Sequence, residues 1–347
     1  MSALPSRRLL AVVKANAYGV GVKEISAAAV NCGCSCLGVA TCEEALQLRS
    51  FGITGDICLL SGVLEEEIPD AVRNDIIMPL TSPESARKIS REALRQSRTA
   101  RGNLVVDTGM GRVGMILPDA QKQIDEIKSL QGLETVGIYS HFSSAGVCDD
   151  EYTLMQLEGF KKFLQTAQLS STCRNVHFAA FDGINNYPES LQKPFNMARC
   201  GIGIYGMNDK NTLKLPLKPA LKFAAKVIDV RELPEGSCIG YMHTAKLKKK
   251  SRIAVISAGY ADGLPLEASN RARFLINGES VPVIGRISMD YTTCDLGDVP
   301  CSPGDEAVIF GASGKEYISV SEAASLRRSH DYDVLCSVGP RSERRYI

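Results

Sequence analysis

The sequence has no apolar run long enough to cross a membrane and no excess of charge of either sign. A transmembrane helix needs about eighteen or more consecutive apolar residues, and no segment approaches that length. The 40 basic and 39 acidic residues leave a net charge of +1. A balanced chain gives no electrostatic reason to expect a nucleic acid or an anionic membrane as partner. We therefore predict neither.

The N-terminal stretch is also too short for an export signal. Arg7 and Arg8 could open one, but only five apolar residues, Leu9 to Val13, follow before Lys14 ends the run. The apolar part of a signal peptide is longer than this. We therefore predict a cytoplasmic protein.

The twelve cysteines do not follow the paired spacing of a disulfide framework. In a chain without an export signal, this predicts reduced thiols. Cys32, Cys34 and Cys36 are separated by single residues, and no second cysteine or histidine pair follows nearby. Structural zinc sites keep two or more residues between ligands, so we predict no metal site and interpret these cysteines as small core or loop residues.

Residues 1–213 predict an α/β fold. Short apolar runs alternate with helix-like segments such as "TCEEALQLRSFG" and "PDAQKQIDEIKSLQG", and the runs are too continuously apolar for a half-exposed sheet. Eight such units fit an N-terminal (β/α)8 TIM barrel. The eight runs are "RLLAVVK", "CLGVAT", "DICLLSG", "DIIMPLTS", "NLVVDTG", "TVGIYSHF", "NVHFAA" and "RCGIGIYG". An open doubly wound sheet is the alternative, but "GIGIYG" lacks the glycine spacing of a dinucleotide site.

Residues 214–347 predict a second, mainly β domain. Strand-like runs such as "LKFAAKVIDV", "RIAVISAGY" and "DEAVIFG" are separated by turn residues. Asn277-Gly278 between two apolar runs is a strong hairpin signal.

Polar residues fall at the ends of the predicted barrel strands, where such barrels perform their chemistry. They are Lys14, Asp107, His141, His177 and Arg199. Three interpretations of Lys14 remain open on these grounds. It could extend its amine to solvent from a strand end, it could bind phosphate although no P-loop motif surrounds it, or it could form a Schiff base with an aldehyde.

Seven blocks of the sequence, in order, resemble those of the alanine racemase family. They are "VVKANAYGVG", "VVDTGMGRVGM", "IYSHFSSA", "ARCGIGIYG", "IGYMHTA", "AGYADG" and "VIGRISMD". The resemblance implies pyridoxal 5'-phosphate as cofactor, a barrel that carries it, and a C-terminal β domain. It also implies a head-to-tail homodimer in which each active site combines the barrel of one subunit with the β domain of the other.

The resemblance assigns the two catalytic bases to Lys14 and Tyr241. Lys14 is implied to hold the cofactor as a Schiff base and to serve as the base on the D face of the substrate. Tyr241 of the other subunit is implied to be the L-face base, because inversion needs bases on opposite faces. Arg199 is implied to face the pyridine nitrogen and His141 to bond that arginine.

The remaining implied residues bind the substrate or the cofactor. Arg112 and the backbone N–H of Met289 are implied to bind the substrate carboxylate. The cofactor phosphate is implied to contact backbone N–H groups and tyrosine hydroxyls, from Gly201, Ile202, Tyr18 and Tyr260.

Three positions depart from the family's usual residues. Val105 stands where the family commonly has a lysine, Phe181 where it has a phosphate-binding serine, and Pro340 where many members have a pocket tyrosine. The sequence thus predicts a racemase that interconverts L-alanine and D-alanine, the latter a peptidoglycan precursor. A serine or broad-specificity racemase and a non-catalytic cofactor-binding barrel are the alternatives.

Overall fold

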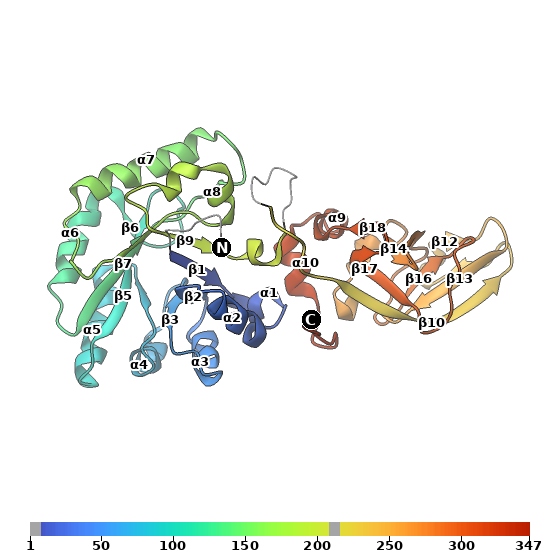
Figure 1. The fold of residues 1–347 in the computed structure, drawn as a ribbon, viewed down its shortest axis with the longest axis horizontal. Coiled ribbons are helices and arrows are strands. Elements are labelled where there is room, and N and C mark those ends of the chain that lie inside the picture. Colours follow the sequence, from blue (N-terminus) through green and yellow to red (C-terminus); the bar gives the residue numbers. More distant parts are fainter. Residues whose placement is uncertain (1–7, 208–215) are drawn as a thin grey trace. The chain divides into compact units, whose positions relative to one another are not determined.

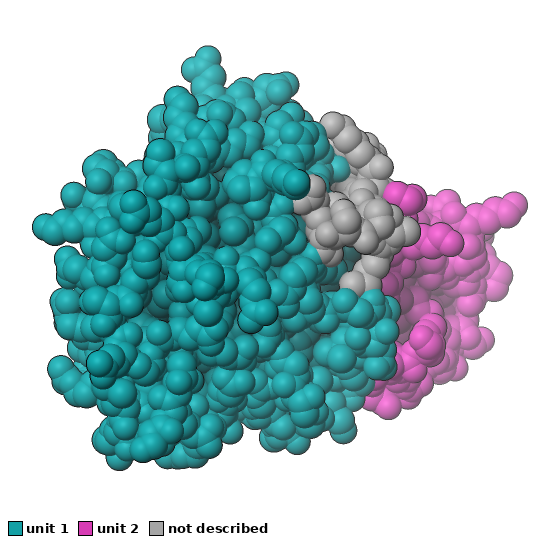
Figure 2. All heavy atoms as spheres, turned by 60° about the vertical axis from the view of Figure 1, so that its left-hand side comes forward, with its two compact units in different colours: residues 1–17, 21–204 teal, residues 18–20, 205–347 magenta. Residues whose placement is uncertain are grey.

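The computed structural model describes residues 8–207 and 216–347. The expected boundary between residues 213 and 214 lies outside the described residues. The chain divides into two compact units, residues 1–17 with 21–204 and residues 18–20 with 205–347 (Figure 2). Among the described residues, no helix has the length and apolar character needed to cross a bilayer.

Unit 1 is a parallel barrel surrounded by helices (Figure 1). Its strands are β1 (Arg8–Val12), β2 (Cys36–Val39), β3 (Asp56–Leu59), β4 (Met78–Leu80), β5 (Ala100–Asp107), β7 (Leu133–Tyr139), β8 (Asn175–His177) and β9 (Met197–Cys200). They run in the order β3-β2-β1-β9-β8-β7-β5-β4, and a bridge between Cys58 and Ile77 brings the two ends of this row together. The predicted (β/α)8 barrel is therefore confirmed.

Helices follow the strands and cover the outside of the barrel. They are α2 (Val22–Asn31), α3 (Cys42–Ser50), α4 (Ile68–Arg73), α5 (Pro83–Arg95), α6 (Leu117–Lys128), α7 (Glu151–Thr166) and α8 (Phe181–Asn186). The segment labelled α1 (Lys14–Tyr18) is a left-handed turn and not a right-handed helix. A short strand β6 (Met115–Ile116) pairs with the end of β5. The last expected run was partly wrong, because β9 ends at Cys200 and residues 202–205 form a 3₁₀ helix. Glycines 201 and 203 are poor strand residues, which accounts for the early end.

The two faces of each barrel strand have different partners. Outward residues such as Ala11, Val13 and Leu37 belong to one apolar cluster with Leu48 and Ile89 of the surrounding helices. This alternation is the period of two that a strand imposes on its side chains. Residues at the intervening positions are also buried but lie outside that cluster: Leu10, Val12, Cys36, Cys58 and Met197. We infer that these face the barrel interior.

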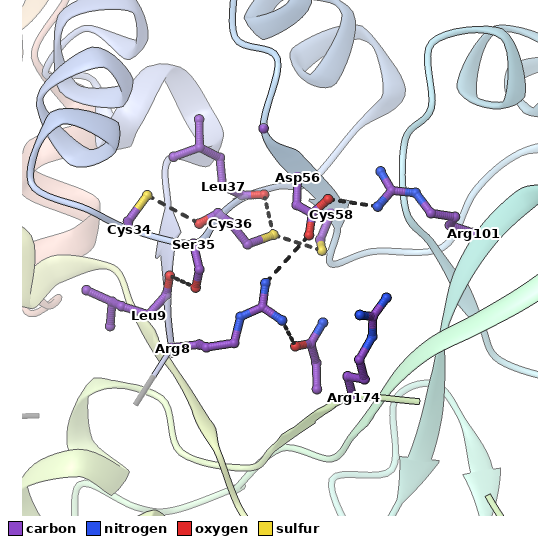
Figure 3. A network of polar contacts seen from close by, with 12 residues as sticks. Arg8, Leu9, Cys34, Ser35, Cys36, Leu37, Asp56, Cys58, Arg101 and Arg174 are labelled. Atoms are coloured by element: carbon purple, nitrogen blue, oxygen red, sulfur yellow. Dashed lines mark hydrogen bonds and ion pairs between the residues drawn. The ribbon is translucent and has the colours of Figure 1, made fainter. Parts of the chain in front are cut away.

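Charged residues meet at the amino ends of the strands (Figure 3). Arg101 binds Asp56 at 2.7 Å and Asp75 at 2.7 Å, and Arg8 bonds Asn175 and pairs with Asp56. Barrels of this kind carry their active sites at the opposite, carboxyl ends of the strands. We therefore interpret this network as structural.

The cysteines of the "CGCSC" segment have different environments. Cys32 is exposed, Cys34 is half-buried and Cys36 is buried. The Cys36 Sγ lies 3.1 Å from the Sγ of Cys58, both as free thiols. Among the described residues, no group of three or more histidine, cysteine or carboxylate side chains could hold a metal ion.

Unit 2 contains an antiparallel sheet with two helices. The strands are β10 (Phe223–Leu233), β11 (Cys238–Ile239), β12 (Ala245–Lys246), β13 (Ser251–Ile256), β14 (Arg273–Ile276), β15 (Glu279–Pro282), β16 (Thr292–Asp295), β17 (Glu306–Ser313) and β18 (Glu316–Ile318), and the helices are α9 (Val320–Leu326) and α10 (Asp331–Ser337). The main sheet runs β15-β14-β17-β10-β13-β16. The predicted hairpin is confirmed, since β14 pairs with β15 across Asn277 and Gly278, both at positive φ. The two central residues of this turn type need that conformation.

Candidate active site

Several cationic side chains gather at the carboxyl ends of the barrel strands. His141, just after β7, is the clearest marker. Arg199 lies within hydrogen-bond distance of its ring, at 2.9 Å. Burial lowers the pKa of His141 most, and the charges of Arg199, Arg112 and Lys14 lower it further, so all three cations act on one imidazole. Residues that are up to 185 positions apart in the sequence therefore meet at one end of unit 1.

Lys14 begins a left-handed turn. Ala15, Asn16, Ala17 and Tyr18 have φ between 52° and 58°, although none of them is glycine. Each such residue costs about 1–2 kcal/mol relative to a right-handed one, so the run persists only because surrounding contacts hold it. Two of these contacts come from within the segment: Ala17 N–H donates to the Val13 carbonyl at 2.9 Å, and Val22 N–H donates to Asn16 Oδ1 at 2.9 Å.

Arg199 is buried and donates hydrogen bonds to four acceptors. Its Nη1 donates to Nδ1 of His177 at 2.6 Å, and its Nη2 donates to Nδ1 of His141 at 2.9 Å. Nη2 also donates to the carbonyls of Ser140 at 2.9 Å and Phe178 at 2.7 Å. Arginine has no acceptor, so both Nδ1 atoms must carry a lone pair, and each neutral ring holds its proton on Nε2.

Aromatic packing completes the support of Arg199. The ring of Tyr139 stacks on His177, with ring centres 4.9 Å apart, and the Arg199 guanidinium lies 5.4 Å from the centre of the Tyr139 ring. Burial lowers the pKa of Arg199 to about 10 and raises the pKa of Tyr139 to about 12. At neutral pH the arginine is therefore charged and the tyrosine is protonated.

Burial, assisted by the Arg199 charge, keeps both histidines neutral. It lowers the pKa of His141 to about 3 and that of His177 well below its ordinary value of 6.5. An imidazolium at either position would face the guanidinium and lose the acceptor that Arg199 requires.

Mild acid is therefore expected to destabilise the barrel. Below pH 6.5 the unfolded chain takes up a proton at His141 and at His177, whereas the folded chain does not. The contribution of the two neutral histidines to the free energy of unfolding is then fully present above pH 6.5. It decreases as the pH falls, by up to about 1.4 kcal/mol per pH unit for each histidine.

Because the chain has no tryptophan, urea unfolding should be followed by far-ultraviolet circular dichroism between pH 7 and 5. His243→Gln, at an exposed position, is the control and should leave the slope unchanged. A stability that stays constant over this interval would contradict the neutral pair.

Arg112 lies on a loop that is organised by Asp107. The Asp107 Oδ1 accepts N–H bonds from Gly109 at 2.8 Å, Met110 at 2.8 Å and Gly111 at 3.2 Å, and Oδ2 accepts one from Arg112 at 3.2 Å. Gly109 and Gly111 have φ of 128° and 67°, a conformation that other residues avoid. The "DTGMGR" motif thus forms a loop wrapped around one carboxylate, with the Arg112 side chain exposed.

The predicted phosphate-binding residues lie after β9. Gly201 and Ile202 lead into the 3₁₀ helix at 202–205, whose first N–H groups have no partners within the helix. Phe181 is buried against this segment, since a Cβ added at Gly203 would lie 2.3 Å from its ring. Tyr18 belongs to unit 2 and is buried, with its ring centre 5.9 Å from that of Tyr205.

The other candidates form an exposed group of loops in unit 2. Tyr241 is 70 % exposed, Met289 51 % and Tyr260 43 %. The backbone of Ser288 and Met289 lies against Gly259. The Ser288 carbonyl accepts the N–H of Tyr260 and the Met289 carbonyl accepts that of Ala261, while Arg286 lies against Gly240. Residues 286–289 therefore connect the loop of Tyr241 with the loop of Tyr260.

Two residues of the site, His177 and Tyr139, were not predicted from the sequence as site residues. The sequence places His177 at a strand end without giving it a role, and it gives Tyr139 none. The alternation within "GIYSH" could have found Tyr139, because residues 137, 139 and 141 share one face of an extended segment. Nothing in the sequence signals that Tyr139 stacks on His177.

The fold and this site define a two-domain protein with a polar, cationic barrel mouth and a separate antiparallel β domain. The model "Alanine racemase, N-terminal domain" matches residues 1–209, and "Alanine racemase, C-terminal domain" matches residues 220–346. The chain belongs to the alanine racemase family, as its motifs indicated.

Individual relatives agree with this assignment. Alanine racemase 2 of Caldanaerobacter subterraneus subsp. tengcongensis is 35% identical, over 98% of this chain and 88% of its own. Among solved structures, an alanine racemase of Clostridium difficile 630 has a TM-score of 0.90 at 29% identity, covering 97% of this chain and 88% of that one. A histidine racemase of Leuconostoc mesenteroides subsp. sake has a TM-score of 0.89 at 25% identity, covering 98% and 91%.

Proposed function

We propose that the protein is a cytoplasmic racemase that interconverts L-alanine and D-alanine with pyridoxal 5'-phosphate, as a homodimer with shared active sites. Within the site, the observation that carries the proposal is the environment of Arg199. Two neutral histidines and two carbonyls hold its guanidinium at the carboxyl ends of the strands, near Lys14.

The residues at this end of the barrel fit the cofactor. The Arg199 Nε–H has no hydrogen-bond partner among the described residues, and this nitrogen is not completely buried. It is therefore available to an outside acceptor such as a pyridine nitrogen. Lys14 supplies an amine for the aldehyde. The positive charges of Lys14, Arg112 and Arg199 favour a ligand that carries a phosphate and a carboxylate.

When bound, pyridoxal phosphate would delocalise the electron pair left when the substrate Cα loses its proton. Arg199 cannot give up a proton at neutral pH, so it donates a hydrogen bond without protonating its acceptor. Lys14 Nζ would remove or return the proton on one face of Cα. The Tyr241 Oη of a second copy would do so on the other face.

The remaining candidates would orient the substrate and the cofactor. The guanidinium of Arg112 and the backbone N–H of Met289 would bind the substrate carboxylate. The N–H groups of Gly201 and Ile202, with the hydroxyls of Tyr18 and Tyr260, would bind the phosphate. As part of this proposal, residues 1–213 form the cofactor-binding barrel and residues 214–347 form the β domain.

Three departures from the family pattern support broader substrate acceptance as the second candidate function. Val105 is buried and pairs in register with Tyr139, Phe181 packs against Gly203, and Pro340 is exposed in unit 2. None of these side chains supplies a hydrogen-bond donor. The neighbour that is a histidine racemase has the same fold.

Chiral chromatography tests the proposal directly. The purified protein is incubated with added pyridoxal phosphate and, separately, L-alanine, L-serine and L-histidine. Fast conversion of alanine supports the proposal, and comparable conversion of another amino acid supports the broader one. Cofactor bound to Lys14 without conversion of any substrate would contradict both and favour a non-catalytic cofactor-binding barrel.

A further inference from the structure

The backbone that follows Lys14 is tied to a carboxylate on another element. Glu44 lies in the first turn of α3, which begins after β2. Its Oε1 accepts the N–H of Ala15 at 2.6 Å, and its Oε2 accepts the N–H of Ala40 at 2.8 Å. Ala15 follows Lys14 at the end of β1, and Ala40 follows the last residue of β2. One carboxylate therefore joins the carboxyl ends of two neighbouring strands.

The position of the Ala15 N–H matters for Lys14. This N–H belongs to the peptide group between Lys14 and Ala15, and the Val13 N–H on the other side of Lys14 donates to the Gly38 carbonyl at 2.8 Å. With both sides held, the ψ angle of Lys14 is restrained, and so is the direction in which its Cα–Cβ bond leaves the backbone. Ala15 is also the first of the four left-handed residues. The strain of that turn favours its relaxation, and a charge-assisted hydrogen bond at its first residue opposes this.

Both oxygens of Glu44 are needed for this arrangement. A carboxylate offers acceptors on both oxygens, whereas a glutamine offers one acceptor and an NH₂ group that would face the second N–H. Glu44 also forms a capping box with Thr41, whose side chain accepts the Glu44 N–H at 3.2 Å. The bond to Ala15 is not part of that box, because it reaches outside α3.

We propose that Glu44 is a positioning residue for Lys14: its carboxylate holds the left-handed turn and sets the direction of the lysine amine at the barrel mouth. This inference rests on the proposed function for its catalytic consequence. Its structural part, which concerns the Ala15 peptide and the exposure of the Lys14 amine to an aldehyde, is independent of turnover.

The first test measures the turn itself. Amide hydrogen exchange at Ala15 and Ala40 is compared between the unmodified protein, Glu44→Gln and Glu43→Gln. Glu43 is the exposed neighbour on the same helix and serves as the matched control. Exchange at Ala15 should rise about tenfold in Glu44→Gln, the equivalent of one lost hydrogen bond, and stay unchanged in Glu43→Gln. Unchanged exchange in both variants would overturn the proposal.

The second test measures Lys14. Pyridoxal phosphate and borohydride are added, and the rate at which the reduced cofactor labels Lys14 is followed by peptide mass spectrometry. Labelling should slow about tenfold in Glu44→Gln and remain normal in Thr41→Ala, which weakens the cap of α3 but leaves the Ala15 bond. Equal slowing in both variants would mean that Glu44 acts only through the helix cap, and a normal rate in Glu44→Gln would overturn the positioning role.

Activity provides the last comparison. Glu44→Gln should lower kcat about tenfold with little change in KM, because the substrate contacts are intact. If Glu44→Gln does not fold, Glu44→Asp is the second variant, because it keeps the charge on a shorter side chain. It should show the same changes in exchange, labelling and kcat, each of smaller magnitude. Absence of any labelling of Lys14 in the unmodified protein would defeat the proposed function, whereas the exchange at Ala15 would still decide the role of Glu44.

Discussion

Lys14→Ala is expected to abolish racemisation, with a loss of at least about a thousandfold, the scale seen when a catalytic nucleophile is removed. The variant has no amine to bind the cofactor aldehyde and no proton acceptor on its face of the substrate. The protein should also lose the visible absorbance of covalently bound pyridoxal phosphate. Both quantities are measured on the protein purified with excess cofactor, by absorbance after gel filtration and by chiral analysis of alanine.

Lys162→Ala is the matched control for this substitution. Lys162 is exposed on α7, and its loss should change neither absorbance nor turnover. A Lys14→Ala protein that still holds the cofactor covalently would assign the aldehyde to another amine. The left-handed turn should persist in the variant, because its hydrogen bonds come from backbone groups, Asn16 and Glu44.

The second large effect is expected from Tyr241→Phe. The variant should retain the bound cofactor and its colour, because the Lys14 amine and Arg199 belong to the barrel. It should lose about 10²–10⁴-fold in kcat, the usual contribution of a general base. The loss should be seen with L-alanine and D-alanine alike, since reversal of the reaction uses the same two groups. Initial rates in both directions measure it.

Tyr317→Phe is the control for the hydroxyl, because Tyr317 lies on β18 and is likewise exposed. An unchanged kcat in Tyr241→Phe would remove this tyrosine from the mechanism. Tyr241 is exposed in the single chain, as it must be if it acts in the active site of a second copy. If so, mixing Tyr241→Phe with Lys14→Ala should restore part of the activity, because one site of a mixed dimer regains both groups.

The sequence predicted the barrel because strand and helix periods alternate regularly in residues 1–213. Each strand run is continuously apolar, since one face meets the helices and the other meets the barrel interior, as Ala11 and Leu10 do. The prediction was least accurate at "RCGIGIYG", where glycines 201 and 203 give way to a 3₁₀ helix. The two glycines could have indicated that the strand ends before residue 201.

The candidate site was partly predictable for a similar reason. Lys14, Asp107, His141 and Arg199 all lie within two residues of the carboxyl end of a strand, and the carboxyl ends of parallel strands converge. The function of Asp107 was not predictable, because its carboxylate binds the N–H groups of its own loop, a geometry that depends on the positive φ of Gly109 and Gly111.

The class of fold, the hairpin at Asn277-Gly278 and the family could be predicted from the residues alone, because these depend on local periods, turn chemistry and ordered motifs. Which side chains support one another could not be predicted in this way, because it depends on the folded barrel. The hydrogen bonds of Arg199 to His141 and His177 join three strand ends, and the hydrogen bond from the Ala15 N–H to Glu44 joins residues 29 positions apart. Such contacts depend on barrel closure and on the direction of individual side chains, and neither is encoded in the spacing of residues along the chain.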